Sequence, residues 1–136
     1  MHKRALMVAA VLALLPWMMG VGAAQDAMSA ADLEDFKLET GQELADLCSA
    51  DAGDPLYTEA TMFCYGVLEG LAQYHDALAR GPEGERIVCP EGPVTRDEYV
   101  QMFLDWAKAH PDVARSEPPA DSVIAAALEK WGPCEE

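Results

Sequence analysis

The four cysteines limit the fold of this chain more than any other feature, because two covalent cross-links leave few ways to arrange so short a sequence. They are Cys48, Cys64, Cys89 and Cys134, and all of them follow an N-terminal leader of the kind that directs export. An even number of cysteines in an exported chain indicates disulfides. No pair has the C-x-x-C spacing of a zinc site or a redox-active dithiol, and the histidines are not clustered. We therefore predict two disulfides, no metal site and no cofactor.

The N-terminus (1–24) has the three parts of a secretory signal peptide. A basic head at 2–4 precedes an unbroken apolar run at 5–15, and small residues lead up to Ala24. We expect cleavage after Ala24, which leaves one exported domain, residues 25–136. The alternative, an uncleaved membrane anchor, is disfavoured by the proline and glycines that interrupt the apolar run. No later stretch is apolar for long enough to cross a bilayer, so we expect no membrane association after cleavage.

The exported part is strongly acidic. Lys3 and Arg4 leave with the leader, so 7 basic residues remain against 24 acidic ones, a net charge of −17. Such a surface repels nucleic acid and anionic lipid, and we expect neither as a partner. It favours a basic protein partner and fast, salt-sensitive association with it. The same charge would also keep an exported protein soluble or suit a saline habitat, and charge alone does not separate these alternatives.

The stretch 57–78 predicts the longest helix. Its apolar face is formed by residues at offsets of three and four, namely Cys64, Val67, Leu68, Leu71, His75 and Leu78. We interpret His75 as a partly buried core histidine. Gly66 and Gly70 lie one turn apart, and we expect them to form a notch that lets a neighbouring backbone approach closely.

Three further helices complete a predicted all-α domain, with its core between residues 36 and 134. Two of them begin at capping boxes, in which a threonine and a glutamate three residues later satisfy free backbone donors; these boxes are Thr40 with Glu43 and Thr95 with Glu98. The last helix opens within residues 116–121 and ends at Gly132. No stretch shows the alternation of a strand.

The spacing of the cysteines does not fix their connectivity, since four cysteines allow three pairings. We favour Cys48 with Cys64, which joins the first two helices across the turn at 51–55. Cys89 with Cys134 would then tie the long loop before the third helix to the C-terminus.

Two polar stretches are candidates for binding a partner. The first is the acidic turn with Asp51 and Asp54, and the second is the loop with Glu83, Glu85 and Arg86. A long polar loop next to a disulfide is a common way for a rigid scaffold to present binding residues. A plain solvated linker has the same composition, and the sequence does not separate the two interpretations.

No set of residues indicates catalysis. All four cysteines are expected to be oxidised, so His75 lacks a nucleophile to activate, and no G-x-S-x-G motif is present. His110 precedes a helix-ending proline, where a cation suits the helix dipole. The acidic residues lack the spacing of a calcium loop. We predict that the chain is not an enzyme.

The landmarks follow one another in a recognisable order. They are Phe36 before Thr40-Gly41, Leu44-x-x-Leu47-Cys48, Cys64-x-Gly66-x-x-x-Gly70, Val88-Cys89-Pro90, Ala109-His110-Pro111, and Ile124-x-x-Ala127-Leu128-x-x-Trp131-x-Pro133-Cys134. This ordered set resembles the Rap/Tai family of type VI secretion immunity proteins, over about Phe36 to Cys134. Trp131 stands where another aromatic, usually phenylalanine, is expected.

The resemblance implies a small helical periplasmic protein, often a homodimer, that binds a secreted peptidoglycan amidase and covers its cysteine–histidine active site. It provides no motif for the residues that contact the amidase. The alternative is a periplasmic stress or chaperone-like protein. In that case, protonation of carboxylates at low pH would relieve self-repulsion and expose apolar helix faces.

Overall fold

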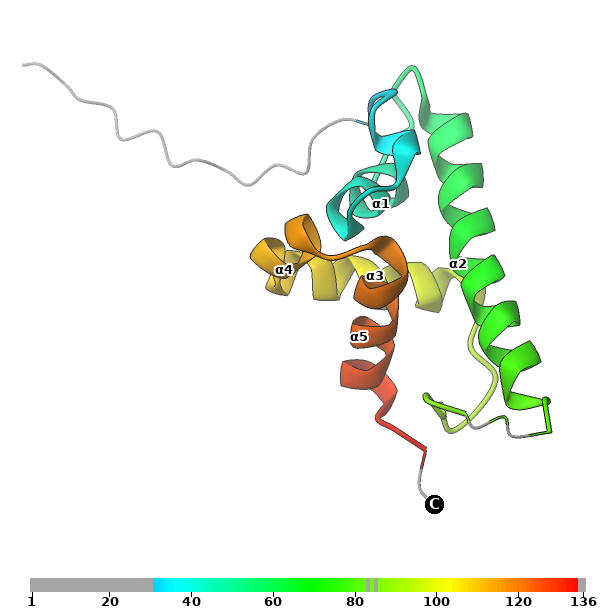
Figure 1. The fold of residues 1–136 in the computed structure, drawn as a ribbon. Helices are drawn as coiled ribbons and strands as arrows, with labels where there is room; N and C mark the ends of the chain where they lie inside the picture. Colours follow the sequence, from blue (N-terminus) through cyan, green and yellow to red (C-terminus); the bar gives the residue numbers. More distant parts are fainter. Residues whose placement is uncertain (1–30, 83, 85, 135–136) are drawn as a thin grey trace, which may run out of the picture.

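The computed structural model describes residues 31–82, 84 and 86–134. The predicted signal peptide therefore lies outside the described residues. Within them the chain forms a short 3₁₀ helix and five α-helices (Figure 1), namely η1 (Asp35–Lys37), α1 (Gly41–Cys48), α2 (Tyr57–Ala79), α3 (Arg96–Ala109), α4 (Pro111–Ser116) and α5 (Pro119–Trp131). The strand-like pairing among these residues is one isolated bridge between Val88 and Pro133. The all-α class is confirmed.

The four expected helices correspond to α1, α2, α3 and α5, and the short helix α4 is an addition. His110 ends α3 and also precedes the first residue of α4, which is Pro111. Proline suits the first helical position, because its missing N–H would have no partner there and its φ is already helical. The proline that stops α3 therefore starts α4.

Helix α1 lies at the centre of the domain and contacts η1, α2, α3, α4 and α5. Its side chains Leu44, Ala45 and Leu47 are completely buried. Phe103 of α3 and Val123 of α5 extend the same core. Since every other helix packs on α1, this eight-residue helix takes part in most of the packing between helices.

The close backbone approach in the core is at Gly41, the first residue of α1. A Cβ at this position would lie 2.3 Å from the Ser122 Oγ atom of α5, and the Gly41 N–H donates to the Glu117 carbonyl at 2.9 Å. Any side chain here would force α1 and α5 apart. Glycine is therefore required at the start of the central helix.

The prediction that Gly66 and Gly70 form a notch for a neighbouring backbone is wrong for the single chain. Both glycines are exposed, and apart from their chain neighbours and the backbone of their own helix, no atom of the described residues lies within 4 Å of a Cβ built on either. Neither has a positive φ, so the backbone of α2 does not need glycine there. Glycine inside a helix costs about 1 kcal/mol relative to alanine. The folded chain thus carries two destabilising residues on an open helix face.

Two disulfides hold the outer elements to the core, in the pairs favoured from the sequence. Cys48 at the end of α1 is bonded to Cys64 of α2, with a Cα–Cα distance of 5.1 Å. Cys89 is bonded to Cys134 beyond α5, with a Cα–Cα distance of 4.9 Å. The first disulfide fixes α2 to the central helix. The second fixes the chain between α2 and α3 to the end of α5.

Both predicted capping boxes are present. The Thr40 and Thr95 hydroxyls each accept a hydrogen bond from the glutamate N–H three residues later, at 3.3 Å. The Glu98 carboxylate in turn accepts from the Thr95 N–H at 2.8 Å and from the Thr95 hydroxyl at 2.7 Å. These two hydrogen bonds, the backbone one first, lower the pKa of Glu98 below its usual value.

We expect removal of each disulfide to destabilise the domain by an amount that depends on the loop it closes. The sequence separations are 16 and 45 residues. Chain entropy then gives about 3 kcal/mol for Cys48→Ser/Cys64→Ser and about 4 kcal/mol for Cys89→Ser/Cys134→Ser. Urea unfolding of the two variants and of the parent measures both values. Losses below about 1 kcal/mol would contradict this account.

The Glu98 cap gives a pH dependence with a definite sign. Because the pKa of Glu98 is lowered in the folded state, its contribution to stability is present at neutral pH. It is lost as the pH falls through the folded pKa. NMR titration of the Glu98 carboxyl should show a lowered pKa that rises in Thr95→Ala and stays low in Thr95→Ser, which keeps the hydroxyl. An unchanged pKa in Thr95→Ala would rule out the Thr95 hydroxyl as a cause, because that variant keeps the backbone N–H of residue 95.

Candidate partner-binding surface

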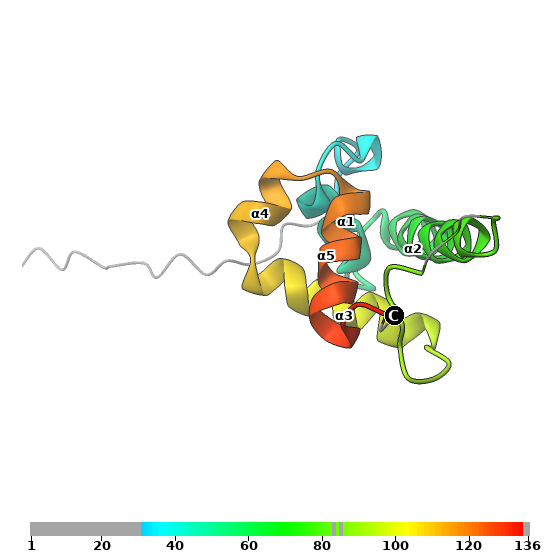
Figure 2. The same cartoon turned by 60° about the horizontal axis from the view of Figure 1, so that its bottom comes forward.

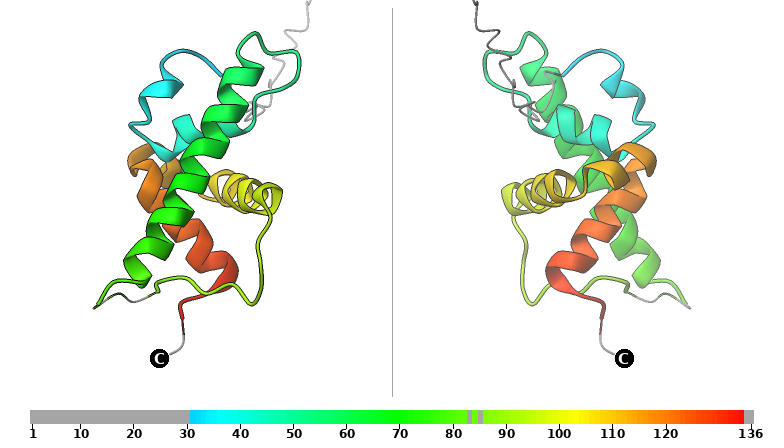
Figure 3. Two further views of the ribbon diagram at one scale, coloured as in Figure 1. Left: turned by 90° about the vertical axis from the view of Figure 1, so that its right-hand side faces the viewer. Right: turned by 90° about the vertical axis from the view of Figure 1, so that its left-hand side faces the viewer.

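Helix α2 lies across the outside of the domain, with α1, α3 and α5 behind it (Figure 3, left). Its inner face buries Ala60, Cys64 and Leu68. Its N-terminal part packs beside α1, and Figure 2 shows the helix pointing away from α4 at the edge of the molecule. Because its neighbours all lie on one side, α2 leaves its other side open to solvent.

The exposed large apolar side chains gather on α2. Five of those found among the described residues lie on this helix, namely Tyr57, Met62, Phe63, Tyr74 and Leu78. Met62 and Tyr74 are each 64% exposed, whereas Phe63 is partly covered by the Phe36 ring, with ring centroids 5.2 Å apart. Grouped exposed apolar residues mark an interaction surface more often than scattered ones do. We define the outer face of α2 by Glu59, Met62, Phe63, Gly66, Gly70, Tyr74, Ala77 and Arg80.

The acidic turn before α2 is a structural feature. The Asp54 N–H donates to the Asp51 carbonyl at 2.8 Å, and Asp54 Oδ1 accepts from the Leu56 N–H at 2.7 Å. Asp54 therefore closes the turn that starts α2. Asp51 is exposed and remains open to a partner.

In the loop predicted to bind a partner, Arg86 belongs to the described residues. Glu83 and Glu85 lie outside them, and their role in binding stays a prediction. Arg86 forms an ion pair with Asp76 of α2, with 3.0 Å between the Arg86 Nη2 and Asp76 Oδ1 atoms. Arg86 begins the segment that crosses from α2 to α3, which we name the return segment (residues 86–94).

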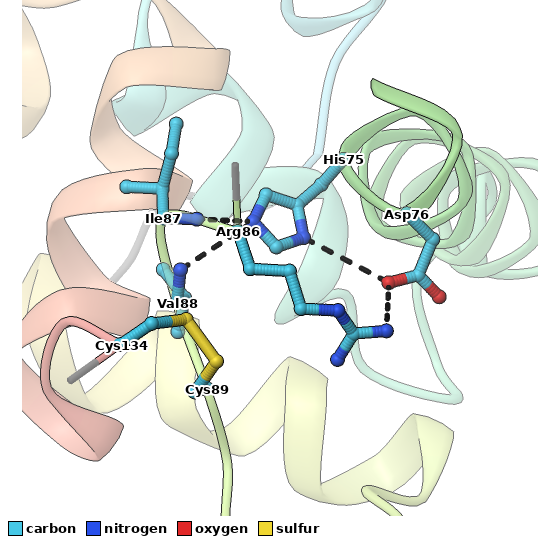
Figure 4. Close-up of a disulfide and its surroundings, with 7 residues drawn as sticks. All are labelled: His75, Asp76, Arg86, Ile87, Val88, Cys89 and Cys134. Carbon is cyan, nitrogen blue, oxygen red and sulfur yellow. Dashed lines mark hydrogen bonds and ion pairs between the residues drawn. A yellow bond between two sulfur atoms is a disulfide. The ribbon is translucent and has the colours of Figure 1, made fainter. Parts of the chain in front are cut away.

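His75 anchors the return segment to α2 (Figure 4). Its Nε2 atom accepts hydrogen bonds from the Ile87 N–H at 3.0 Å and the Val88 N–H at 3.4 Å. An imidazole that accepts through Nε2 carries its proton on Nδ1, so the ring is neutral in this arrangement. The expectation that His75 is partly buried is confirmed, and its partner is the backbone next to Cys89.

A cavity of about 330 Å³ lies between the second half of α2, the return segment, α3 and the end of α5. Leu68, Val88, Val94 and Trp131 contribute apolar surface to it, and Arg86 and Arg96 contribute charge. Tyr99 also lines it, and burial raises the pKa of the Tyr99 hydroxyl, with a smaller effect from the charge of Asp76. The cavity is large enough to receive a side chain from a partner.

The two candidate stretches do not form one surface in a single chain. The Asp51–Asp54 turn precedes the first residue of α2, and Arg86 follows its last (Figure 1). Twenty-three helical residues span roughly 34 Å. A partner would have to cover the whole of α2 to reach both.

The cysteines and the histidines of the described residues have structural partners. All four cysteines are bonded, and no group of three potential metal ligands is found among the described residues. His110 caps the end of α3, where its Nε2 atom lies 2.9 Å from Glu129 Oε2 and its ring lies tilted against Trp106, with centroids 5.1 Å apart. In the same residues, no helix combines the length and apolar character needed to cross a membrane.

The outer face of α2 was not predicted, although the sequence contains a signal for it. Met62 falls on the side of the helix opposite the predicted apolar face, and Tyr74 falls at the margin of that face, next to Val67. Apolar residues outside the main stripe of an amphipathic helix indicate a second contact surface.

We expect His75→Leu to loosen the return segment, because the Ile87 and Val88 N–H groups lose their acceptor. Each lost hydrogen bond is worth about 1 kcal/mol. Hydrogen exchange at these two amides should become several-fold faster, with a smaller change in His75→Gln, which retains an acceptor. Equal exchange in the parent and in His75→Leu would show that His75 does not hold the segment.

Comparison with known proteins gives one match. The family model described as Rap1a immunity proteins matches residues 40–134, from the first capping threonine to the last cysteine. Neither a curated protein nor a solved structure matches the chain. The matched range includes both disulfides, the return segment and all five α-helices. The chain therefore belongs to the Rap1a immunity protein family.

Proposed function

We propose that this chain is exported to the periplasm and neutralises a type VI secretion effector, a peptidoglycan amidase, by covering its active site. Membership of the immunity family implies an effector protein as partner. The amidase, the blocking mechanism and the location are our proposal. They rest on the family likeness together with the predicted signal peptide and the two disulfides, which suit an oxidising compartment.

The observation that carries the proposal is the rigid apolar tip at the C-terminal end of α2. Leu78 is 52% exposed and Ile87 is 48% exposed. The Ile87 backbone is bonded to His75, one turn before Leu78, and Cys89 is fixed two residues later. Exposed apolar side chains on a fixed segment lose little conformational entropy when they bind. Such a tip, beside a cavity, suits insertion into the groove of an enzyme.

The chain would act by binding alone. The described residues contain no free cysteine and no metal-binding group, and the histidines there already have structural partners. The net charge of −17 would speed association with a basic effector. The family likeness also implies a homodimer, whose contact surface must leave the tip accessible.

The proposal predicts a stoichiometric complex with an amidase encoded beside the gene for this chain. Calorimetric titration should give a dissociation constant that rises with salt, since part of the attraction is between surface charges. Ile87→Asp and Leu78→Asp should each weaken binding at least tenfold and restore hydrolysis of peptidoglycan by the amidase. Val113→Asp, at an apolar position of similar exposure on α4, serves as the control.

Absence of binding to the amidase would overturn the proposal. Binding that is indifferent to Ile87→Asp and Leu78→Asp would retain the immunity function and reject the tip as its site. If the chain bound no amidase but prevented aggregation of unrelated proteins only after acidification, the stress-protein alternative would replace it.

A further inference from the structure

The outer face of α2 is chemically complementary to the same face read in the opposite direction. Along the helix it begins with an acid, continues with a large apolar residue, has two glycines at its centre, and ends with an aromatic residue and a base; these are Glu59, Met62, Gly66, Gly70, Tyr74 and Arg80. All six are exposed. Within the described residues, none of their side chains has a hydrogen bond or ion pair.

We propose that two copies of the chain pair through this face, with their α2 helices antiparallel and in closest contact at Gly66 and Gly70. The proposal deepens the homodimer part of the proposed function, since it names the contact surface. A two-fold axis between the two glycines places Gly66 opposite Gly70 of the second copy. It also places Met62 opposite Tyr74, a pairing in which sulfur meets an aromatic ring.

Charge determines the direction of the pair. In the antiparallel arrangement Glu59 of one copy comes within reach of Arg80 of the other, and the two contacts are related by symmetry. A parallel arrangement would set Glu59 against Glu59 and Arg80 against Arg80. The helix dipoles also favour the antiparallel pair, because each positive N-terminus lies beside a negative C-terminus.

The face itself supplies both members of each charge contact, Glu59 and Arg80, so the occupant that matches it is a second copy. Two exported chains of charge −17 repel each other overall, so their contact must lie on a surface with few charges. Between Met62 and Tyr74, α2 has one charged residue, Glu69, whose carboxylate accepts a hydrogen bond from Gln73 at 2.9 Å. Glu69 lies at the margin of the face, about a quarter turn from Gly70.

Gly66 and Gly70 provide an independent argument for the pairing of two copies. Their backbone is ordinary helix and no neighbour within the described residues crowds them, so the single chain gains nothing from glycine at either position. A second helix packed on them would gain, because the absence of side chains allows the two backbones to approach closely. The destabilising residues of the single chain thus become the centre of the pair.

Analytical ultracentrifugation of the exported domain, from about 1 to 200 µM, tests the proposal. The parent should be a dimer at the upper concentrations. Gly66→Glu and Gly70→Glu should each raise the dimer dissociation constant at least tenfold. Both variants should fold well, because glutamate is a better helix former than glycine. Val113→Glu on α4 is the matched control and should leave the dimer unchanged.

Charge exchange tests the direction of the helices. Glu59→Arg alone and Arg80→Glu alone should each weaken the dimer, and the double variant should restore it. A parent that stays monomeric to 200 µM, or glycine variants that remain as dimeric as the parent, would overturn the proposal. A double variant weaker than both single variants would reject the antiparallel register.

The result of the dimer experiment can be distinguished from the result of the amidase-binding experiment. Gly70→Glu leaves Leu78 and Ile87 intact, so it should still bind the amidase as a monomer. Loss of dimerisation with retained amidase binding supports both proposals. A dimer that binds no amidase rejects only the immunity mechanism, and a monomer that binds amidase rejects only the pairing.

Discussion

The disulfide between Cys48 and Cys64 is the constraint on which the position of the outer face of α2 depends. Helix α1 is the element against which every other helix packs, and Cys48 is its last residue. The inner face of α2 buries Ala60, Cys64 and Leu68, and Val67 and Leu71 are partly buried against the core. The disulfide adds a covalent bond to these contacts and joins a helix with an open outer face to the buried central helix. It thereby allows α2 to keep its outer face free of partners within the chain.

Much of the fold could be predicted because it depends on local chemistry. The capping boxes at Thr40 and Thr95 begin helices wherever the following residues can continue them, and both did so. The apolar stripe at Cys64 and Leu68 identified the buried face of α2. Helix α4 escaped detection because six residues between two prolines give no periodic signal.

The candidate surface was harder to predict, because sequence spacing shows which residues share a face and not what covers that face. Gly66 and Gly70 do lie together, yet the helix turns them outward, while the tight contact occurs at Gly41, an isolated glycine in the sequence. Asp54 lies in the turn that the sequence predicted, and its carboxylate is used to close that turn. The distance between Asp51 and Arg86 depends on the length of α2, which makes them separate sites in one chain.

The disulfides join each cysteine to its neighbour in sequence, the first with the second and the third with the fourth. A chain that emerges N-terminus first from an export pore presents its thiols to an oxidant in the same order. Oxidation on arrival would therefore form the correct pairs, and rearrangement by thiol–disulfide exchange would be unnecessary. The second pair must wait for Cys134, near the end of the sequence. The tip formed by Leu78 and Ile87 would then be the last part of the molecule to become rigid.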